Sequence, residues 1–374
     1  MSGFERRLKN DLQLRKETGI YRELPDFYGN SDFYSNDYLG LAREPFNMPA
    51  PFSGSSRLIG GNTFSHETLE KNVADFFAVE AALCFNSGYS ANIGVIPALC
   101  KKNDSILYDA ACHSSIKDGI RLSYAQAYKF KHNDIADLER LLNNRKGKET
   151  FIITEGLFSM LGDVPPLDEL LFLAEKYDAK LIIDEAHSAG IFGHQGKGIV
   201  SHYSSERIVT KLVTFGKAFG SHGAAILCSD GVKDYLINFA RSLIYTTALP
   251  AQIIERTKHM LTREDLEERR EKLQKNTTLF NRLTVELNSV SHPHSPIKII
   301  QYTNKDKLKE VELKLKDNGI GCKAIYAPTV PEGEECLRII LHSYNSTQEI
   351  QQLAVILSLT NCSFIKNNVA KAQL

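Results

Sequence analysis

Residues 211–228 read KLVTFGKAFGSHGAAILC, two strand-like apolar runs joined by a glycine-rich turn. The turn contains a cation, Lys217, between valine, phenylalanine and alanine. Burying a charged amine among apolar side chains costs free energy unless the charge is paired or used. Taken alone, a lysine in such a turn is more often a surface residue whose amine reaches water. A functional role for Lys217 therefore requires a partner residue elsewhere in the chain.

Size and composition limit the classes of protein to consider. The chain has 374 residues, enough for one large domain and a smaller one. Lys plus Arg and Asp plus Glu number 45 each, so bulk charge favours neither nucleic acid nor an anionic membrane as a partner. The N-terminal MSGFERRLKNDLQLRKE lacks the apolar core of a signal peptide. Seven scattered cysteines contain no C-x-x-C pair, which favours reduced thiols and no zinc site. These features predict a cytoplasmic protein without a metal.

Short apolar runs alternate with helical patterns between residues 80 and 230. The runs are AALCFN, SILYD, AYKF, TFIITEG, KLIIDEAH, KLVTFG and HGAAILCS. Such alternation predicts an α/β fold with a mainly parallel seven-stranded sheet covered by helices. Ligands of open α/β sheets bind beyond the carboxyl ends of the strands, so the polar residues that follow the runs are candidates for a site.

A second, smaller unit follows a charged helical segment over residues 250–290. Its pattern is strand IKIIQYT, helix KDKLKEVELKLKDNG, strand CLRIILHSY and helix STQEIQQLAVILSL. We therefore expect an N-terminal helix or arm over 1–45, a large α/β domain over 46–255 and a small C-terminal α+β domain over 256–374.

The segment KLIIDEAHSAG places Asp184 directly after a buried run. One interpretation is the D-E-A-H box of nucleic-acid helicases, but it requires a G-x-x-x-x-G-K-[ST] loop, and no Gly-Lys pair here is followed by Ser or Thr. The glycines of GKAFGSHG also lack the G-x-G-x-x-G spacing of a dinucleotide site. An ordinary strand-end turn remains an alternative for Asp184 considered alone.

Asp184 and Lys217 together indicate a specific chemistry, because both end predicted strands of one sheet. A lysine in an apolar pocket loses hydration of its cation, so its amine becomes available to form a Schiff base. A carboxylate opposite it suits the pyridinium nitrogen of pyridoxal phosphate, which then acts as an electron sink. The pair predicts a pyridoxal phosphate site.

Three further turns offer groups for such a cofactor. In FNSGYSAN, small residues at Ser87 and Gly88 precede a helix whose first amides can bind a phosphate, and Thr214 can add a hydroxyl. In YDAACHSS, His113 can stack on a flat ring or simply cap a helix. TEGLFSMLGD supplies Ser159 at another strand end. Each turn alone is also explained by ordinary helix capping.

These residues resemble the α-oxoamine synthase family of fold type I pyridoxal phosphate enzymes. The matching segments run in family order from about residue 33 to 345: FYSNDYLGL, FNSGYSAN, HNDIADLERLL, TEGLFSMLGDVPPLDEL, IIDEAHSAGIFGHQGKG, TFGKAFGSHGAAI, RSLIYTTALP and CLRIILHSYN. The resemblance implies a fold type I transferase with the large and small domains expected above.

The resemblance also implies roles for individual residues. Lys217 would bond to the cofactor and move the α-proton of the substrate, Asp184 would pair with the pyridine nitrogen, and His113 would stack on the ring. His187 would contact the ring hydroxyl. The remaining residues around the cofactor would be Ser87, Gly88, Tyr89, Ser159 and Thr214, with Thr246 or Thr247 reaching the phosphate from a second subunit. The site would therefore be shared in a homodimer.

The implied reaction joins an amino acid to an acyl thioester with loss of carbon dioxide. Arg338 would hold the amino acid carboxylate through a planar bidentate contact, assisted by Asn36, and Arg22 would lie near the acyl donor. Among family members, the chain most resembles those that make 8-amino-7-oxononanoate for biotin synthesis, from L-alanine and pimeloyl-CoA or pimeloyl acyl carrier protein.

Two alternatives stay open at this point. Enzymes of the glycine C-acetyltransferase or serine palmitoyltransferase type use another amino acid and acyl chain, and one methyl group separates their pockets. A non-catalytic protein that binds pyridoxal phosphate or a nucleotide is the other. The chain also departs from the family at Ser114, at Leu161 and in a shortened segment over residues 42–62, where acyl-chain entry or dimer contacts would differ.

Overall fold

The chain folds into two compact units in a computed structural model. The structure describes residues 3–18, 21, 30–49, 54–144, 149–287, 289–302, 304–327, 330 and 332–371, with side chains described as far as residue 360. One unit comprises Asn36–Gln274 and His342–Tyr344, and the other Met1–Ser35, Lys275–Leu341 and Asn345–Leu374. The domain borders expected from the sequence, 1–45, 46–255 and 256–374, stay a prediction.

The helices have the following bounds: α1 Gly3–Glu17, α2 Phe64–Phe77, α3 Gly88–Leu99, α4 Ser114–Ser123, α5 Ile135–Leu142, α6 Leu167–Lys176, α7 Asp230–Phe239, α8 Arg241–Ile244, α9 Ala251–Leu261, α10 Leu266–Leu283, α11 Lys305–Asp317 and α12 Thr347–Lys371. The strands are β1 Ser31–Asp32, β2 Ala81–Phe85, β3 Ser105–Asp109, β4 Gln126–Phe130, β5 Thr150–Glu155, β6 Lys180–Asp184, β7 Ile208–Thr214, β8 Ala224–Cys228, β9 Ile297–Gln301, β10 Ile320–Gly321, β11 Lys323–Ile325 and β12 Cys336–Ile340.

The larger unit is built on a seven-stranded sheet with the strand order β2-β8-β7-β6-β5-β3-β4. Strand β8 runs antiparallel to its neighbours β2 and β7, and the other neighbouring pairs are parallel. The predicted α/β class with a mainly parallel seven-stranded sheet is therefore confirmed.

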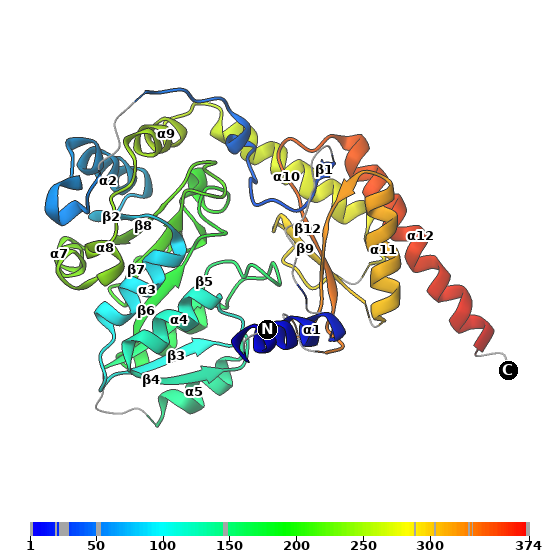
Figure 1. Ribbon diagram of the computed structural model, residues 1–374, viewed down its shortest axis with the longest axis horizontal. Coiled ribbons are helices and arrows are strands. Elements are labelled where there is room, and N and C mark those ends of the chain that lie inside the picture. The colour runs from blue at the N-terminus through cyan, green and yellow to red at the C-terminus, as the bar shows by residue number, and fades with distance from the viewer. Residues whose placement is uncertain are drawn as a thin grey trace. The chain divides into compact units, whose positions relative to one another are not determined.

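Helices cover both faces of this sheet (Figure 1). On one face, α2 and α9 pack over β2, β7 and β8, and α5 and α6 pack over β3, β5 and β6. On the other face, α3, α4, α7 and α8 pack over the same strands. Because both faces are buried, the central strands read as continuous apolar runs rather than as alternating patterns.

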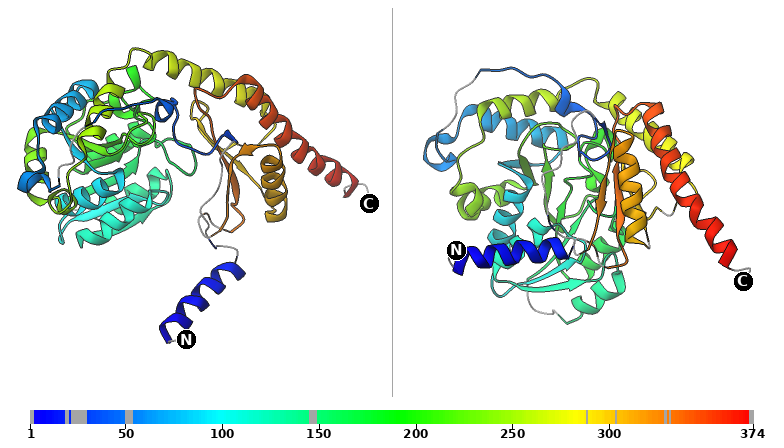
Figure 2. Two further views of the ribbon diagram at one scale, coloured as in Figure 1. Left: turned by 45° about the horizontal axis from the view of Figure 1, so that its top comes forward. Right: turned by 45° about the vertical axis from the view of Figure 1, so that its right-hand side comes forward.

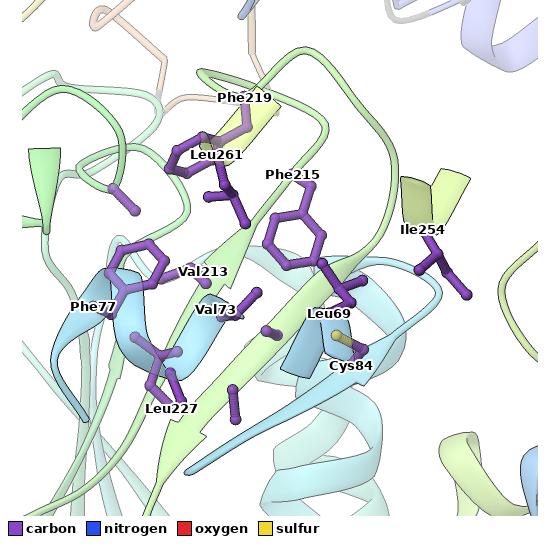
Figure 3. Packing of buried hydrophobic residues seen from close by; sticks show 14 of the residues in the cluster. Leu69, Val73, Phe77, Cys84, Val213, Phe215, Phe219, Leu227, Ile254 and Leu261 are labelled. Carbon is purple, nitrogen blue, oxygen red and sulfur yellow. The ribbon is translucent and has the colours of Figure 1, made fainter. Parts of the chain in front are cut away.

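The turn after β7 is anchored by an aromatic cluster beneath it (Figure 3). Phe219 is fully buried and meets Phe77 and Phe215 edge to face, with ring centroids 6.2 and 6.4 Å apart. Gly220 adopts φ +54°, and a Cβ there would lie 2.2 Å from the backbone nitrogen of Ala42. Since a side chain at Gly220 would clash, glycine is required for this turn. The cluster and the close approach thus fix the backbone around Lys217.

The smaller unit contains the three-stranded sheet β11-β12-β9, in which both pairs are antiparallel, and the short parallel pair β1-β10. Both views in Figure 2 show α11 beside the strands, with α12 next to it. Helix α12 buries Ile350, Leu353 and Leu357. This arrangement is the α+β pattern expected from the sequence.

Other general features concern only the described part of the chain. No helix there is long and apolar enough to cross a membrane. The six cysteines with described side chains, Cys84, Cys100, Cys112, Cys228, Cys322 and Cys336, are free and buried. Within the described residues, no group of three or more His, Cys, Asp or Glu side chains could hold a metal ion.

The aromatic cluster leads to a stability prediction. Phe219→Ala should lower the free energy of unfolding by about 3–5 kcal/mol, because it leaves a cavity beneath the Lys217 turn. Phe172 on α6 is 65% exposed, so Phe172→Ala serves as the matched control and should change stability little. Chemical denaturation followed by circular dichroism measures both, and equal effects would contradict the proposed anchoring role.

Candidate active site

The carboxyl ends of parallel strands bring acidic side chains to one edge of the large sheet. In the sheet register Glu155 at the end of β5 pairs with Asp184 at the end of β6, and Asp184 pairs with Leu212 of β7. Lys217 follows β7 by three residues. The site expected beyond the strand ends therefore has its groups on adjacent strands.

Asp184 is buried and held by hydrogen bonds on both carboxylate oxygens. Oδ1 accepts from the backbone N–H of Ala186 at 2.9 Å, and Oδ2 accepts from Nδ2 of Asn92 on α3 at 2.8 Å. The same Asn92 amide donates to Oγ of Ser115 at 2.9 Å, and this hydroxyl lies 2.8 Å from Nδ1 of His113. A continuous polar network therefore links Asp184 to His113.

Glu155 lies beside Asp184 and is almost completely buried. Burial, reinforced by the neighbouring charge of Asp184, raises the pKa of Glu155. Its Oε1 accepts from the backbone N–H of His113 at 2.5 Å, and the backbone N–H of Ser159 also donates to this carboxyl group. Glu155 thus fixes the two turns that carry His113 and Ser159.

His113 caps α4 through Nδ1, which accepts from the backbone N–H of Ser115 at 3.2 Å. Partial burial lowers its pKa, an effect that Asp184 opposes and Lys217 reinforces. Because Nδ1 accepts a hydrogen bond, the proton of the neutral imidazole lies on Nε2. Asp184 and Lys217 thus both act on this ring through their charges.

The partner of Lys217 is His187. The Lys217 Nζ atom lies 2.6 Å from Nε2 of His187, and Nδ1 of His187 lies 2.6 Å from the hydroxyl of Tyr38. The Tyr38 hydroxyl also donates to Oδ1 of Asn36 at 3.3 Å. The structure therefore brings Lys217, His187 and Asn36 together, with Tyr38 between the last two.

The candidate phosphate site lies at the N-terminus of α3. Ser87 caps the helix by accepting from the backbone N–H of Ser90 at 3.0 Å, in a reciprocal capping box. A Cβ on Gly88 would lie 3.9 Å from Cβ of Thr214, so the helix start and the end of β7 are neighbours. The Thr214 hydroxyl donates to the carbonyl of Gly223 at 3.1 Å. To bind a phosphate, this hydroxyl would give up that hydrogen bond and donate to a phosphate oxygen instead.

Tyr89 and the loop after α8 have partners within the same chain. The Tyr89 hydroxyl donates to the carboxylate of Asp118 on α4, which raises the pKa of Tyr89, and its side chain is 47% exposed. Asn86, next to Ser87, donates through Nδ2 to Oγ1 of Thr246 at 3.1 Å and to the carbonyl of Thr247 at 2.9 Å. The loop thus adjoins the candidate phosphate site of its own chain.

Two expected substrate contacts stay predictions. Arg338 lies on β12 in the smaller unit, opposite Lys323 and Ile299 in the register. Arg22 lies outside the described residues.

Sequence reasoning missed Tyr38, Asn92 and Ser115 as members of the site. Tyr38 and Asn92 stand inside the family segments SNDYLG and GYSAN, which were the only signal for them. Ser115 follows His113 by two residues and resembles an ordinary first-turn serine.

A second missed cluster joins the ends of β3 and β4 to the loop between β5 and α6. His132 follows β4. Its Nδ1 atom lies 2.8 Å from Oδ1 of Asp109 at the end of β3, and its Nε2 atom lies 2.7 Å from Oδ2 of Asp163. Phe158 packs edge to face on the imidazole, with ring centroids 4.5 Å apart. Burial lowers the pKa of His132 most strongly, but the hydrogen bonds that its ring donates to the two carboxylates, together with their negative charges, raise the pKa to about 9. A protonated His132 thus ties down the loop that carries Ser159.

The donor set fits pyridoxal phosphate. A buried carboxyl group lies near a half-buried lysine amine and two imidazoles, and a capped helix N-terminus next to Thr214 suits a phosphate. These groups match the cofactor's pyridine nitrogen, aldehyde, ring hydroxyl and phosphate in kind.

Comparisons with known proteins place the chain in a family. The family model described as aminotransferase class I and II matches residues 32–357. A putative 8-amino-7-oxononanoate synthase of Methanocaldococcus jannaschii is 36% identical over 94% of this chain and 97% of its own length. An 8-amino-7-oxononanoate synthase of Lysinibacillus sphaericus is 37% identical, covering 94% and 96%.

The chain belongs to the class I and II aminotransferase family, in its α-oxoamine synthase branch. Solved structures agree with this assignment. The 8-amino-7-oxononanoate synthase of Francisella tularensis has a TM-score of 0.77 at 34% identity, covering 91% of this chain and 99% of its own. The serine palmitoyltransferase of Sphingomonas wittichii has a TM-score of 0.85 at 23% identity, covering 97% and 98%. The latter shares the fold, and the predicted fold type I transferase is confirmed.

The His132 cluster predicts a pH effect on stability. The pKa of His132 is higher in the folded protein than in the unfolded chain. Its contribution to the free energy of unfolding is therefore fully present below the unfolded pKa of about 6.5 and is lost as the pH rises through about 9. The loss is on the order of 3 kcal/mol. His132→Asn, which has no proton to lose, should be less stable at pH 7 and lack this alkaline step. Denaturant unfolding of both proteins between pH 6 and 10 measures the difference, and parallel curves would refute the assignment.

Proposed function

We propose that this chain is a pyridoxal phosphate-dependent acyltransferase that joins L-alanine to a pimeloyl thioester of coenzyme A or acyl carrier protein. The products are 8-amino-7-oxononanoate, carbon dioxide and the free thiol, and the reaction belongs to biotin synthesis in the cytoplasm. The observation that carries the proposal is the cluster of Asp184, His113 and Lys217 in one site. Relatives of that name at 36% and 37% identity over 94% of the chain support the choice of substrates.

Each residue of the cluster would hold one part of the cofactor. Asp184 would accept the hydrogen bond of the pyridine nitrogen, and His113 would stack on the ring. The start of α3, with Ser87 and Gly88, would hold the phosphate together with Thr214, while Ser159 and Tyr89 complete the surroundings. When bound, pyridoxal phosphate supplies an electron sink for the negative charge that forms on the substrate α-carbon.

Proton movement in the reaction falls to Lys217. Its free amine would take the α-proton of the amino acid and later return a proton to the same carbon. The neighbouring His187 Nε2, at 2.6 Å, can hold a proton for the amine between these steps. Asn92 holds the carboxyl group of Asp184 in place, so that this group need not reorganise as charge develops.

Three further residues would hold the substrates. Arg338 presents a planar fork suited to the amino acid carboxylate. Asn36 would assist it, because its Oδ1 already lies next to Tyr38 in the cluster. Arg22 would lie near the acyl donor. The carboxylate of the amino acid would thus be bound by Arg338, and its α-proton would be taken by Lys217.

The active site would be completed in a homodimer. Residues 55–56 hydrogen-bond with Thr247 and Ala248, so two exposed segments lie side by side. They carry the exposed apolar side chains Ile59 and Tyr245, 85% and 72% accessible. Exposed apolar side chains next to a functional loop suit a contact with a second copy, whose Thr246 or Thr247 would reach the phosphate.

The second candidate function is a condensation with glycine or serine. It is favoured by the fold shared with serine palmitoyltransferase. A non-catalytic protein that binds the cofactor has less support, because such a protein has no need for the lysine amine, the imidazole beside it and the buried carboxyl group.

An assay of the amino acid and acyl donors tests the proposed function. Purified protein with pyridoxal phosphate and pimeloyl thioester should release carbon dioxide and 8-amino-7-oxononanoate with L-alanine, detected by mass spectrometry. Turnover only with glycine or serine would keep the family and reject the named reaction. Lys217→Ala should abolish turnover while retaining the fold, as seen by circular dichroism, and unchanged turnover would reject Lys217 as the catalytic residue.

Arg338 leads to a separate prediction about the amino acid. Arg338→Ala should raise the apparent KM for the amino acid about 10- to 100-fold, because a charge-assisted contact to the carboxylate is lost. Arg338→Lys should recover part of this, since it keeps the charge without the fork. Lys323 is the register partner of Arg338 on β11, so Lys323→Ala is the matched control. A near-normal KM in Arg338→Ala would remove this residue from the substrate site.

A further inference from the structure

A cavity of about 870 Å³ lies in the larger unit, at the opposite end of β7 from Thr214 and Lys217. It is lined by the end of α2, by part of the connection between β6 and β7 within residues 194–206, by the first half of β7, and by the end of β8 with the start of α7. Pockets that bind small molecules have volumes of about 300–1,000 Å³. The cavity is therefore large enough for an organic ligand, and its lining residues are not those of the candidate active site.

Two lysines with unpaired amines line this cavity. Lys197, in the β6–β7 connection, and Lys211, on β7, are both half-buried. Within the part of the chain that the structure describes, neither amine forms a hydrogen bond or an ion pair. Burial lowers the pKa of Lys211, an effect that the charge of Glu185 opposes only in part. Because a half-buried cation without a partner costs free energy, these two amines suit a negatively charged ligand.

Glu185 is not an ion-pair partner for Lys211. Its Oε1 accepts from the backbone N–H of Val200 at 3.0 Å and from the Ser188 hydroxyl at 3.1 Å. Burial raises the pKa of Glu185, so its negative charge is disfavoured where it lies. The carboxyl group thus supports its own loop and leaves the Lys211 amine to the cavity.

The acidic residues of the lining do not neutralise the two lysines either. Glu80 and Glu206 are exposed, and Oε1 of Glu80 accepts from the backbone N–H of Asp230 at 3.0 Å. Solvent and salt screen exposed charges more strongly than half-buried ones. Although two acids and two lysines balance in formal charge, the inner part of the cavity is therefore positive.

One wall of the cavity is apolar. Phe77 and Leu227 are only 3% and 1% exposed and belong to the apolar cluster on the α2 side of the sheet, where Val79 packs against it. Figure 3 shows Leu227 at the end of this cluster away from Phe219. Lys211 pairs with Leu227 in the register of β7 and β8, and paired residues point to the same face of a sheet. A cation thus stands directly beside an apolar wall.

We propose that this cavity is a binding site for a small organic carboxylate with an apolar body. Lys197 and Lys211 would bind the carboxylate, and the wall of Phe77 and Leu227 would contact the apolar body. Inorganic phosphate would leave that wall unused, and an uncharged molecule would leave both amines without a partner. The site is separate from the cluster around Lys217, so the inference does not depend on the proposed reaction.

The location of Lys211 predicts that binding and stability respond in opposite directions. Lys211→Met keeps a long unbranched side chain and removes the charge, so the folded protein no longer has to bury an unpaired ammonium group. Its melting temperature should equal or exceed that of the natural protein. A residue whose replacement removes binding without lowering stability is retained for its function rather than for folding.

The first experiment is isothermal titration calorimetry of the purified protein with octanoate, octanol and inorganic phosphate as separate probes. Octanoate should bind, and the other two should bind at least about tenfold more weakly, because each lacks one of the two parts that the cavity recognises. Absence of octanoate binding, equal affinity for octanol, or binding of phosphate alone would overturn the inference.

Variants show whether octanoate binds in this cavity. Lys211→Met and Lys197→Met should each weaken octanoate binding roughly 10- to 100-fold. Lys71 on α2 is 73% exposed and pairs with Asp75, so Lys71→Met is the matched control and should bind as the natural protein does. Unchanged affinity in Lys211→Met, or a loss of binding only in Arg338→Ala, would place octanoate elsewhere and overturn the inference.

A photoreactive octanoate that carries a diazirine on its chain locates the site without any variant. After irradiation and digestion, peptide mass spectrometry should find the label within residues 194–206, 208–211 or 227–232, which line the cavity. An excess of unlabelled octanoate should remove this labelling. Label found only on other peptides would contradict the proposed site, whichever reaction the protein catalyses.

Discussion

The buried carboxyl group of Asp184 is the constraint on which the rest of the site depends. Without its hydrogen bonds to Asn92 and to the backbone of Ala186, this group would be too costly to bury at the end of β6. Asn92 must therefore project from α3 toward the strand end, which sets the position of the helix over the sheet. The N-terminus of α3 and His113, which caps α4, follow from that placement, because Asn92 also bonds to Ser115.

The next residue along the chain shows how one strand end serves two purposes. Glu185 points to the other side of β6, where Oε1 accepts from the backbone of Val200 at 3.0 Å and from Ser188 at 3.1 Å. Burial raises its pKa. A Cβ on Gly198, which adopts φ +93°, would lie 2.5 Å from Oε1, so only glycine lets the loop wrap around this carboxyl group. Asp184 serves the site, and Glu185 supports the loop behind it.

The central strands of the large sheet were predictable because they are apolar runs buried on both faces, as KLIID of β6 illustrates, whereas the edge strand β4 is largely exposed. Asp184 and Lys217 were expected near one another because strand ends meet at one edge of the sheet, whereas His187 was expected only from the family resemblance, and the roles of all three stay predictions. The short strands β1, β10 and β11, of two or three residues, have no such pattern. Tyr38 could not be predicted, because its partner His187 is 149 residues away and one sequence contains no record of that contact. The placement of Arg338 toward the substrate stays a prediction for the same reason.

The most direct test of the central claim is to locate the covalent bond between protein and cofactor. The protein is loaded with pyridoxal phosphate, treated with borohydride to make the bond permanent, digested and analysed by peptide mass spectrometry. The account predicts one modified residue, Lys217, with little modification when Asp184 is replaced by Ala, because the ring then loses its partner. Modification of other lysines with none at Lys217, or no modification at all, would contradict the assignment of this cluster as a pyridoxal phosphate site.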